Sequence, residues 1–482
     1  MAGIGFELKR LFGKKGLTLN LRANLYASVV VAGPALLGAV LLLGINWLAY
    51  LAGAPRHERD LVVVVVTYSI LFPLFLTSFL SFVLTRYVAD MLYENQVQRV
   101  LPSMYGAISL CLVAGGLAWI WFLSVSGLPF RYGVFSFMLF CEAVVVWVQL
   151  SYANAAKDYR SAFLGFALGI LTGLVSGYLL IWLLHLEVVL SLLVAVCIAY
   201  GVMIVSLTVV LHGYFPIGRG SSLRFLEWVD KYPSLILVGF FTVAGLFAHI
   251  MVMWWSPLGI QVIGLFYHSP AHDIPALLAM FTTLVTAVNF VTSVEVSFYP
   301  KYRQYFSLVN EGGSLSDIDQ AKEEMAVVLK QELFYLAQIQ MAVEIIAIAL
   351  AGTLLPRLGM GFTPASIGLF RVLCVGYGLY AIGNAMVLFL LYLSKYRDAM
   401  TASMILFLVN TLGSIASLGL PQYYLGFGFL AAGVCLFLTA WIKLAASISH
   451  LDHDIFCNQP IFVTQKNGAL SRLARRLDHQ HG

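Results

Sequence analysis

The chain has 482 residues, of which 61% are hydrophobic and 11% are charged. Soluble domains carry about a quarter charged residues, so this composition excludes an ordinary soluble protein. The formal net charge of +5 comes from basic residues spread over the loops between apolar runs, and it therefore does not indicate nucleic-acid binding.

Apolar runs long enough to cross about 30 Å of hydrocarbon recur along the whole chain. They predict an all-α membrane protein of about twelve transmembrane helices. No small-residue cleavage site follows the first run, so we expect that run to be retained as a span. The runs start near residues 23, 61, 104, 132, 162, 188, 232, 273, 328, 364, 399 and 422.

The basic residues predict how the chain is oriented. Of the 28 Lys and Arg residues, only Arg56, Arg59, Arg131 and Arg357 fall on one side of the predicted membrane, and Arg371 falls inside a span. Because cytoplasmic loops carry the excess of Lys and Arg, both termini are predicted to be cytoplasmic.

Two segments are predicted to be amphipathic helices at the cytoplasmic interface. In residues 1–22, Ile4, Leu8, Leu11 and Phe12 share one helical face, as in helices that lie along a membrane surface. The second segment covers residues 316–330, where Ser316 is the expected N-cap. Its acidic face is a candidate partner-binding surface, with a solvated face as the alternative; it consists of Asp317, Asp319, Glu323 and Glu324.

A polar, glycine-containing linker at 213–231 divides the spans into two lobes, 23–212 and 232–447, followed by a cytoplasmic tail at 448–482. The motif Thr77-Ser78 followed by Arg86-Tyr87 recurs as Thr292-Ser293 followed by Lys301-Tyr302. Each copy lies at the end of a predicted span, at the same position in the two halves of the chain. This recurrence predicts two six-helix lobes related by a pseudo-two-fold axis along the membrane normal.

Ionisable groups at bilayer depth are candidate functional residues, because each costs at least about 2.5 kcal/mol there. Glu142 is predicted near the bilayer midplane, with Gln149 on the same helical face. Glu344 and Arg371 lie on stripes of small residues, so both are expected to point inward. They are either an ion pair or part of a gate or substrate contact in a water-filled cavity.

The eighth predicted span carries a polar stripe at helical spacing. Hydroxyl and amide groups suit a neutral, hydroxyl-rich substrate, and interhelical hydrogen bonding is the alternative role. The stripe consists of Thr282, Thr286, Asn289 and Ser293, with Glu295 and Tyr299 towards the cytoplasmic mouth.

Enzyme signatures are absent from the sequence. No Gly-rich phosphate loop followed by Lys-Ser/Thr, no catalytic Ser/His/Asp order and no metal-binding helix occurs. The triplet Asp452-His453-Asp454 is similar to a nucleotide-sugar metal site over three residues only, and we interpret it as a solvated tail segment. The sequence therefore predicts no enzymatic activity, no cofactor and no metal site.

Several segments resemble the PelG family. They are Met1 to Leu8 (MAGIGFEL), Gly33-Pro34, Glu295 to Tyr302 (EVSFYPKY), Gly312 to Ile318 (GGSLSDI) and Tyr396-Arg397-Asp398. The resemblance implies an inner-membrane exporter of the Pel exopolysaccharide, within the superfamily of multidrug, oligosaccharidyl-lipid and polysaccharide exporters. That superfamily implies a two-lobed, alternating-access fold of twelve helices.

The resemblance also implies a substrate and partners. The substrate would be an N-acetylhexosamine-rich polymer made by a cytoplasmic glycosyltransferase, and the partners would be companion Pel membrane proteins, including a cyclic-di-GMP receptor. Two alternatives stay open. One is a flippase for lipid-linked oligosaccharides or an ion-coupled drug exporter, and the other is a non-transporting scaffold that recruits and activates the glycosyltransferase.

Overall fold

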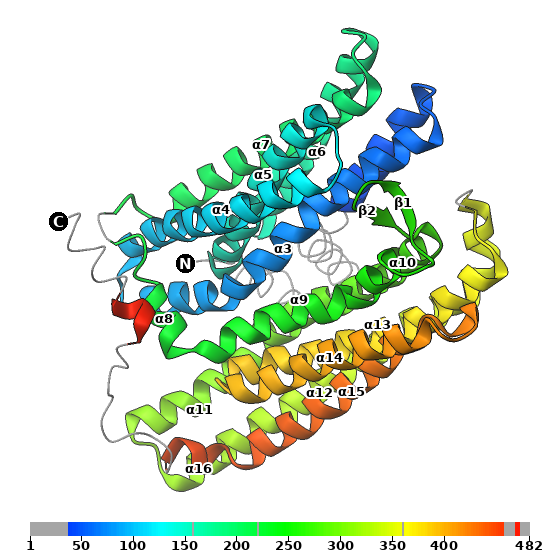
Figure 1. Ribbon diagram of the computed structural model, residues 1–482. Helices are drawn as coiled ribbons and strands as arrows, with labels where there is room; N and C mark the ends of the chain where they lie inside the picture. The colour runs from blue at the N-terminus through cyan, green and yellow to red at the C-terminus, as the bar shows by residue number, and fades with distance from the viewer. Residues whose placement is uncertain (1–36, 157–158, 219–220, 359–360, 457–467, 473–482) are drawn as a thin grey trace, which may run out of the picture. The chain divides into compact units, whose positions relative to one another are not determined.

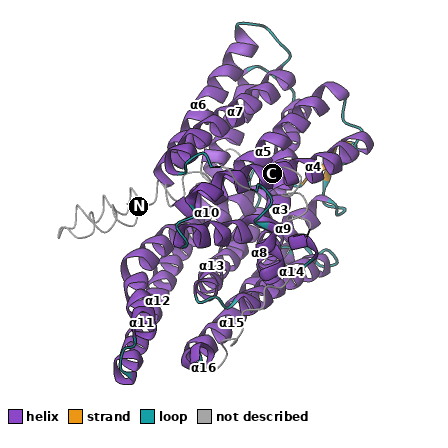
Figure 2. Ribbon diagram, turned by 90° about the vertical axis from the view of Figure 1, so that its left-hand side faces the viewer, coloured by secondary structure: helices purple, strands orange, loops and turns teal. Residues whose placement is uncertain are grey.

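A computed structural model describes residues 37–156, 159–218, 221–358, 361–456 and 468–472. These residues are almost wholly helical (Figure 2). The amphipathic face predicted at Ile4, Leu8, Leu11 and Phe12 and the proline at position 34 lie outside the described residues.

Eleven helices in the described chain are long and apolar enough to cross a membrane, and a shorter apolar helix, Leu37–Leu51, precedes them. Their order follows that of the predicted spans, so the all-α, multi-spanning prediction is confirmed. The orientation of the termini stays a prediction. The long helices are α3 (Arg56–Tyr93), α4 (Val100–Val125), α5 (Phe130–Ala156), α6 (Tyr159–Trp182), α7 (Val188–Tyr214), α9 (Pro233–Trp254), α10 (Pro270–Thr292), α12 (Leu315–Leu354), α13 (Pro364–Tyr392), α14 (Tyr396–Ser417) and α15 (Phe427–Ser449) (Figure 1).

One element was not expected from the sequence. Between α9 and α10, strands β1 (Ile260–Ile263) and β2 (Phe266–His268) form a small antiparallel hairpin with Gly264 at its turn. Gly264 has a φ of 49°, and a Cβ there would lie 1.7 Å from the Ser126 carbonyl oxygen. Only glycine fits this turn, and the Leu265 amide bonds the same oxygen at 2.9 Å.

The described residues form two compact units. The N-terminal unit contains residues 37–244, 254–269 and 468–472, and the C-terminal unit contains 245–253 and 270–456. Helix α9 thus contributes residues to both units. The predicted lobe boundary at 213–231 and the pseudo-two-fold axis stay predictions.

Within the N-terminal unit, α6 packs closely on α7 through a row of glycines. Gly165, Gly169, Gly173 and Gly177 recur every four residues along one face of α6. A Cβ on Gly173 would lie 2.7 Å from the Ala199 Cβ and 3.0 Å from a backbone oxygen of α7. Small residues allow this approach, and van der Waals packing then holds the pair together in lipid.

In the C-terminal unit, α15 packs against both α13 and α14 (Figure 1). A Cβ on Gly433 would lie 2.7 Å from the Gly376 carbonyl oxygen, and one on Gly428 would lie 2.5 Å from the carbonyl carbon of Gly413. Helix α15 therefore touches both α13 and α14 at the level of the backbone.

Two of the predicted spans are parts of longer helical segments. Helix α10 runs through a π-helical turn, η2 (Ser293–Phe298), into α11 (Tyr299–Glu311), and α12 follows after a turn at Gly312 (φ 80°). The predicted separate helix at 316–330 is therefore wrong, because it is the first part of the 40-residue α12. Ser314, not Ser316, is the N-cap and accepts the Asp317 amide at 3.2 Å.

The C-terminal part of the predicted linker at 213–231 is packed within the N-terminal unit. Helix α8 (Leu226–Lys231) contributes Trp228, which is 8% exposed and donates to the Asp90 carboxylate of α3 at 2.8 Å. Asp230 accepts the backbone amide and the hydroxyl of Ser471, both at 2.7 Å. A short part of the predicted C-terminal tail is thus bound to the linker.

The α6–α7 packing predicts the effect of one methyl group. Gly173→Ala places a Cβ against Ala199 and a backbone oxygen, neither of which can rotate away, so we expect overpacking to cost about 1–3 kcal/mol. Ala should also gain about 1 kcal/mol of helix propensity, so the net effect is a lower thermal midpoint in detergent. Gly368→Ala in α13 is the matched control, because no atom lies within 4 Å of its added Cβ. An unchanged midpoint for Gly173→Ala would contradict the packing argument.

Candidate functional site

A buried polar network joins α10 to α12 in the C-terminal unit. Glu344 is 7% exposed, and its Oε1 accepts the Thr282 hydroxyl at 2.7 Å and the Gln340 amide at 2.5 Å. The Thr286 hydroxyl donates to Oε1 of Gln340 at 2.5 Å. The Cys374 thiol of α13 lies beside the same carboxyl. The inward position predicted for Glu344 is therefore confirmed, and Thr286 shares its network.

Arg371 departs from the prediction. Its side chain is exposed rather than buried, and a Cβ on Gly352 would lie 3.3 Å from its Nη2. The guanidinium thus extends over α12 two turns away from Glu344. Within the described residues the two side chains form no ion pair. A long side chain can carry its charge along the helix away from the apolar interior, which removes the need for a buried partner.

The later residues of the polar stripe on α10 have different surroundings from Thr282 and Thr286. Asn289 donates to the Val285 carbonyl of its own helix at 2.8 Å, and Ser293 is 3% exposed at the start of η2. Glu295 lies within this π-helical turn and is half-buried, and Tyr299 is 38% exposed just after it. Such turns shift the helical register and are frequent at functional sites.

Glu142 and Gln149 lie in the N-terminal unit and both face α7. The Gln149 amide donates to the Thr208 hydroxyl at 2.8 Å. Glu142 is half-buried beside Gly201 and Cys197. Cys197 donates to the Phe135 carbonyl at 3.6 Å, and Oε2 of Glu142 makes no hydrogen bond within the described residues. A buried carboxyl oxygen without a hydrogen-bond donor is costly within an apolar span, which keeps Glu142 a candidate functional residue.

The predicted site residues therefore fall into separate groups. Thr286 and Glu344 are brought together, through Gln340. Glu142 and Gln149 share a helix face in the other unit, and Arg371 lies apart from Glu344. Each group combines hydroxyl, amide and carboxyl groups, which can exchange hydrogen bonds with sugar hydroxyls or hold a proton.

Two histidines were missed by the sequence analysis. His249 in α9 and His272 at the start of α10 lie together, buried at 0% and 2% exposure. An ionisable ring inside an apolar span is itself a signal of function, and His249 could have been found in that way. Among the described residues no group of three His, Cys, Asp or Glu side chains could hold a metal ion.

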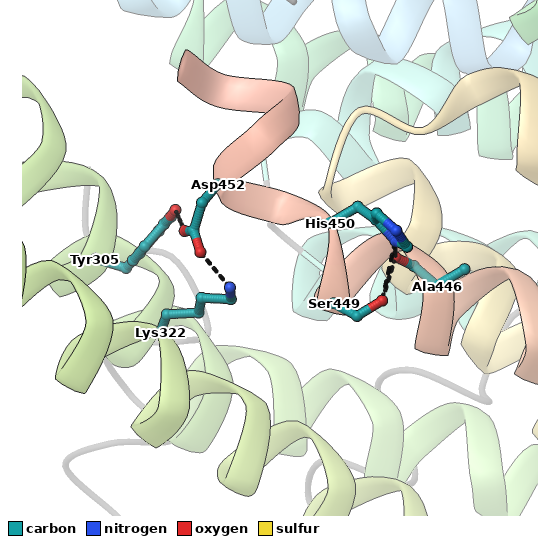
Figure 3. Close-up of polar contacts among 6 residues, drawn as sticks. All are labelled: Tyr305, Lys322, Ala446, Ser449, His450 and Asp452. Carbon is teal, nitrogen blue, oxygen red and sulfur yellow. Dashed lines mark hydrogen bonds and ion pairs between the residues drawn. The ribbon is translucent and has the colours of Figure 1, made fainter. Parts of the chain in front are cut away.

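Asp452 lies outside the apolar core and is held in place. It accepts the Tyr305 hydroxyl at 2.9 Å and forms an ion pair with Lys322, as Figure 3 shows. These contacts fasten α16 (Leu451–Phe456) to α11 and α12. The interpretation of this triplet as a solvated segment is wrong for Asp452, because its carboxylate is engaged by two neighbouring helices.

One residue of the predicted acidic surface forms an ion pair within the chain. Glu324 pairs with Lys301 of α11 at 2.8 Å. Asp317, Asp319 and Glu323 are exposed. The apolar face opposite them is buried, since Ile318, Ala321, Met325 and Leu329 are 1–6% exposed.

Solved structures with the same fold are transporters. "Crystal structure of MATE in the straight conformation" matches with a TM-score of 0.62 at 12% identity, over 89% of this chain and 96% of that one. An outward-facing multidrug resistance MATE family transporter of the MOP superfamily matches at 0.60 and 14% identity, over 89% and 96%. An inward-facing one matches at 0.59 and 12%, over 89% and 99%. These likenesses show that the chain shares the fold of these membrane transporters.

The sequence gives the family within this class. No curated protein sequence matches the chain. The family described as "PelG: Putative exopolysaccharide Exporter (EPS-E)" matches residues 1–456. The chain belongs to this family, and in a bacterium it is a protein of the inner membrane.

The buried network predicts a specific loss of stability. Gln340→Leu removes the acceptor of Thr286 and one donor to Glu344, and interhelical hydrogen bonds in membranes are worth about 0.6 kcal/mol on average and up to about 1.7 kcal/mol. We expect a lower thermal midpoint for the purified protein in detergent. Gln338→Leu, at an exposed position of the same helix, should leave it unchanged. Equal midpoints for the two variants would show that the network does not stabilise the unit.

A second prediction concerns α16. Asp452→Asn keeps an acceptor for the Tyr305 hydroxyl but removes the charge that attracts Lys322. Because both partners are partly exposed, we expect at most about 1 kcal/mol of stability to be lost. Asp452→Leu should cost more, since it also leaves Tyr305 without its acceptor. Thermal unfolding at low and high salt measures both, and a salt-independent effect of Asp452→Asn would contradict the ion-pair explanation.

Proposed function

We propose that the chain moves the Pel exopolysaccharide, an N-acetylhexosamine-rich polymer, across the bacterial inner membrane. The observation that carries this proposal is the family match over residues 1–456. The transporter fold supports it independently, because the matched solved structures cover 89% of the chain. The polymer would come from a cytoplasmic glycosyltransferase, and companion Pel proteins would complete the synthase-secretion complex.

The polar groups within the spans suit such a substrate. Hydroxyls, amides and carboxylates exchange hydrogen bonds with sugar hydroxyls, and they are pre-positioned because they already bond one another. Thr282, Gln340 and Glu344 are the best-organised set. The substrate-path residues of this proposal are Glu142, Gln149, Thr286, Asn289, Ser293, Glu295, Tyr299, Glu344 and Arg371.

The length of the substrate limits the mechanism. Matched proteins of this fold are described as outward-facing and as inward-facing. These descriptions favour a transporter that can open to either side of the membrane. A ligand smaller than the binding site can be moved by alternating access, whereas a polymer longer than the membrane is thick must be fed through in steps. We therefore propose that chain extension by the glycosyltransferase and movement through the transporter are coupled.

The surface formed by Asp317, Asp319 and Glu323 supports a role in partner binding. These exposed carboxylates lie on a helix that is anchored on its other face by buried apolar residues, and a fixed acidic surface fits a basic partner. Glu324 contributes less, because Lys301 already neutralises it. Recruitment of the glycosyltransferase and transport can coexist in one protein.

Drug export is the second candidate function, and the likeness to a multidrug resistance transporter favours it. That likeness is at 14% identity and concerns the fold alone. A rise in drug resistance upon expression, without polymer secretion, would favour this candidate over polysaccharide export.

Co-reconstitution tests the proposal. The full-length chain and its glycosyltransferase are placed in lipid vesicles with the synthase outside, and enclosed polymer is measured after enzymatic digestion of the exterior. Wild type should enclose polymer. Glu344→Gln should enclose roughly tenfold less, because a hydrogen bond to a charged group is worth about 1.5–3 kcal/mol.

Glu311→Gln is the matched control, since Glu311 is exposed at the end of α11, and it should behave as wild type. Polymer that is synthesised but found only outside the wild-type vesicles would contradict transport by the chain. That result would favour the non-transporting scaffold. Equal enclosure by Glu344→Gln and wild type would remove Glu344 from the substrate path.

A further inference from the structure

Four aromatic rings of the C-terminal unit contact one another where η2 and α11 meet the end of α13. Phe298 and Phe389 are both 0% exposed, and their ring centroids lie 5.1 Å apart. Tyr302 and Tyr392 are half-buried, and their rings meet edge to face at 5.4 Å. Phe298 lies 5.9 Å from each of the two tyrosine rings. The phenylalanines therefore form a buried base, and the two tyrosines pack on it with part of their surface exposed.

The backbone is irregular on both sides of these rings. On one side the π-helical turn η2 directly precedes α11. Because one residue of an α-helix corresponds to a rotation of about 100°, the wider turn changes the direction in which the side chains of α11 project. On the other side α13 ends at Tyr392, and Ser394 follows with a φ of 60°. A left-handed conformation is costly for a residue other than glycine, and such residues cluster at functional sites.

Two further side chains extend the surface that the tyrosines form. Tyr299 is 38% exposed and lies one turn before Tyr302, and residues three apart are neighbours on a helix. Glu295 is half-buried within η2, one turn before Tyr299. An ionisable group in an apolar helical segment is costly, and neither ring packing nor membrane anchoring requires one. We call Glu295, Tyr299, Tyr302 and Tyr392 the tyrosine platform.

Aromatic rings beside a carboxylate provide the two kinds of contact that a sugar makes. The face of a pyranose ring that carries axial C–H groups is apolar and weakly positive, so it packs on the negative face of an aromatic ring. The sugar hydroxyls donate hydrogen bonds to a carboxylate and exchange them with phenol hydroxyls. A half-buried tyrosine can offer both its ring and its hydroxyl, whereas the buried rings of Phe298 and Phe389 can only support it.

The charge pattern predicts on which side of the membrane the tyrosine platform lies. Basic residues flank Tyr302 and follow Tyr392; they are Lys301, Arg303, Lys395 and Arg397. Because an excess of Lys and Arg marks the cytoplasmic side, the platform is predicted to face the compartment in which a cytoplasmic glycosyltransferase would make the polymer.

We propose that the tyrosine platform is a binding site for the pyranose units of the exopolysaccharide. This inference rests on the proposed function, because it concerns the same substrate. The platform stacks sugar units as the polymer approaches the spans, and the polar stripe with Asn289 and Ser293 precedes it on the same helical segment, Pro270–Glu311. Tyrosines that only anchor a helix at the membrane surface would bind no sugar.

Binding to the purified chain tests the tyrosine platform. The full-length protein in detergent is titrated with pentamers of N-acetylglucosamine and of N-acetylgalactosamine, and the heat of binding is measured. Wild type should bind at least one of them saturably. Tyr302→Leu and Tyr392→Leu should each weaken binding roughly tenfold, which corresponds to about 1.4 kcal/mol, because each removes one ring. Tyr302→Phe should bind nearly as well as wild type, since it keeps the ring.

Tyr335→Leu is the matched control, because Tyr335 is a 44% exposed tyrosine of α12 in the same unit and lies outside the platform. It should bind as wild type does. Elution as a single species in detergent verifies that each variant is folded. No saturable binding of either pentamer by wild type, or wild-type affinity in correctly folded Tyr302→Leu and Tyr392→Leu, would overturn the platform.

The titration and the vesicle experiment can fail separately. Wild-type vesicles that enclose polymer, together with wild-type pentamer affinity in both leucine variants, would leave transport standing and remove the tyrosine platform. A wild-type chain that binds a pentamer through the tyrosines but encloses no polymer would support the platform and contradict transport.

Discussion

The interior of a bilayer offers no water, and the arrangement of this chain depends on that one constraint. A carboxylate such as Glu344 must find its hydrogen-bond donors within the protein, because each unsatisfied polar group in hydrocarbon costs several kcal/mol. Thr282 and Gln340 supply donors to Oε1 from two helices, whereas Oε2 has no hydrogen-bond partner among the described residues. The hydrogen bond from Thr282 to Glu344 therefore also holds α10 against α12. The same bonds serve the fold and the candidate site.

Close contact between helices is the second consequence of the same environment. Lipid tails are as apolar as leucine, so apolar side chains gain little by meeting one another, and helices associate where their backbones approach. The glycines of α6 facing α7, and those where α15 meets α13 and α14, allow this approach. Those of α15 hold it against α13, and α13 carries Cys374 and Gly378 beside Glu344. The position of the site thus depends on glycines, which have no functional side chain.

Much of the fold could be predicted because it is a matter of hydropathy along the chain. The order of the spans is read from hydropathy, and the structure confirms it. The prediction was wrong about where one helix begins and about where one long side chain lies. A glycine pair and a serine gave a helix start two residues late, and the Arg371 side chain, placed inward by its stripe of small neighbours, lies exposed beside Gly352. Periodicity specifies the helix face at Cα, and not where a long side chain ends.

By itself the sequence determined that the chain is a multi-pass, all-helical membrane protein, and its motifs determined the family, because hydropathy and local motifs are properties of neighbouring residues. Only the tertiary structure decided which polar groups meet. Thr286 and Gln340 are 54 positions apart, and His249 and Tyr377 are 128 apart. Such pairs depend on which helices pack together and at what rotation, and these are set by the sum of many small contacts along α9, α10, α12 and α13. No short stretch of sequence contains that information.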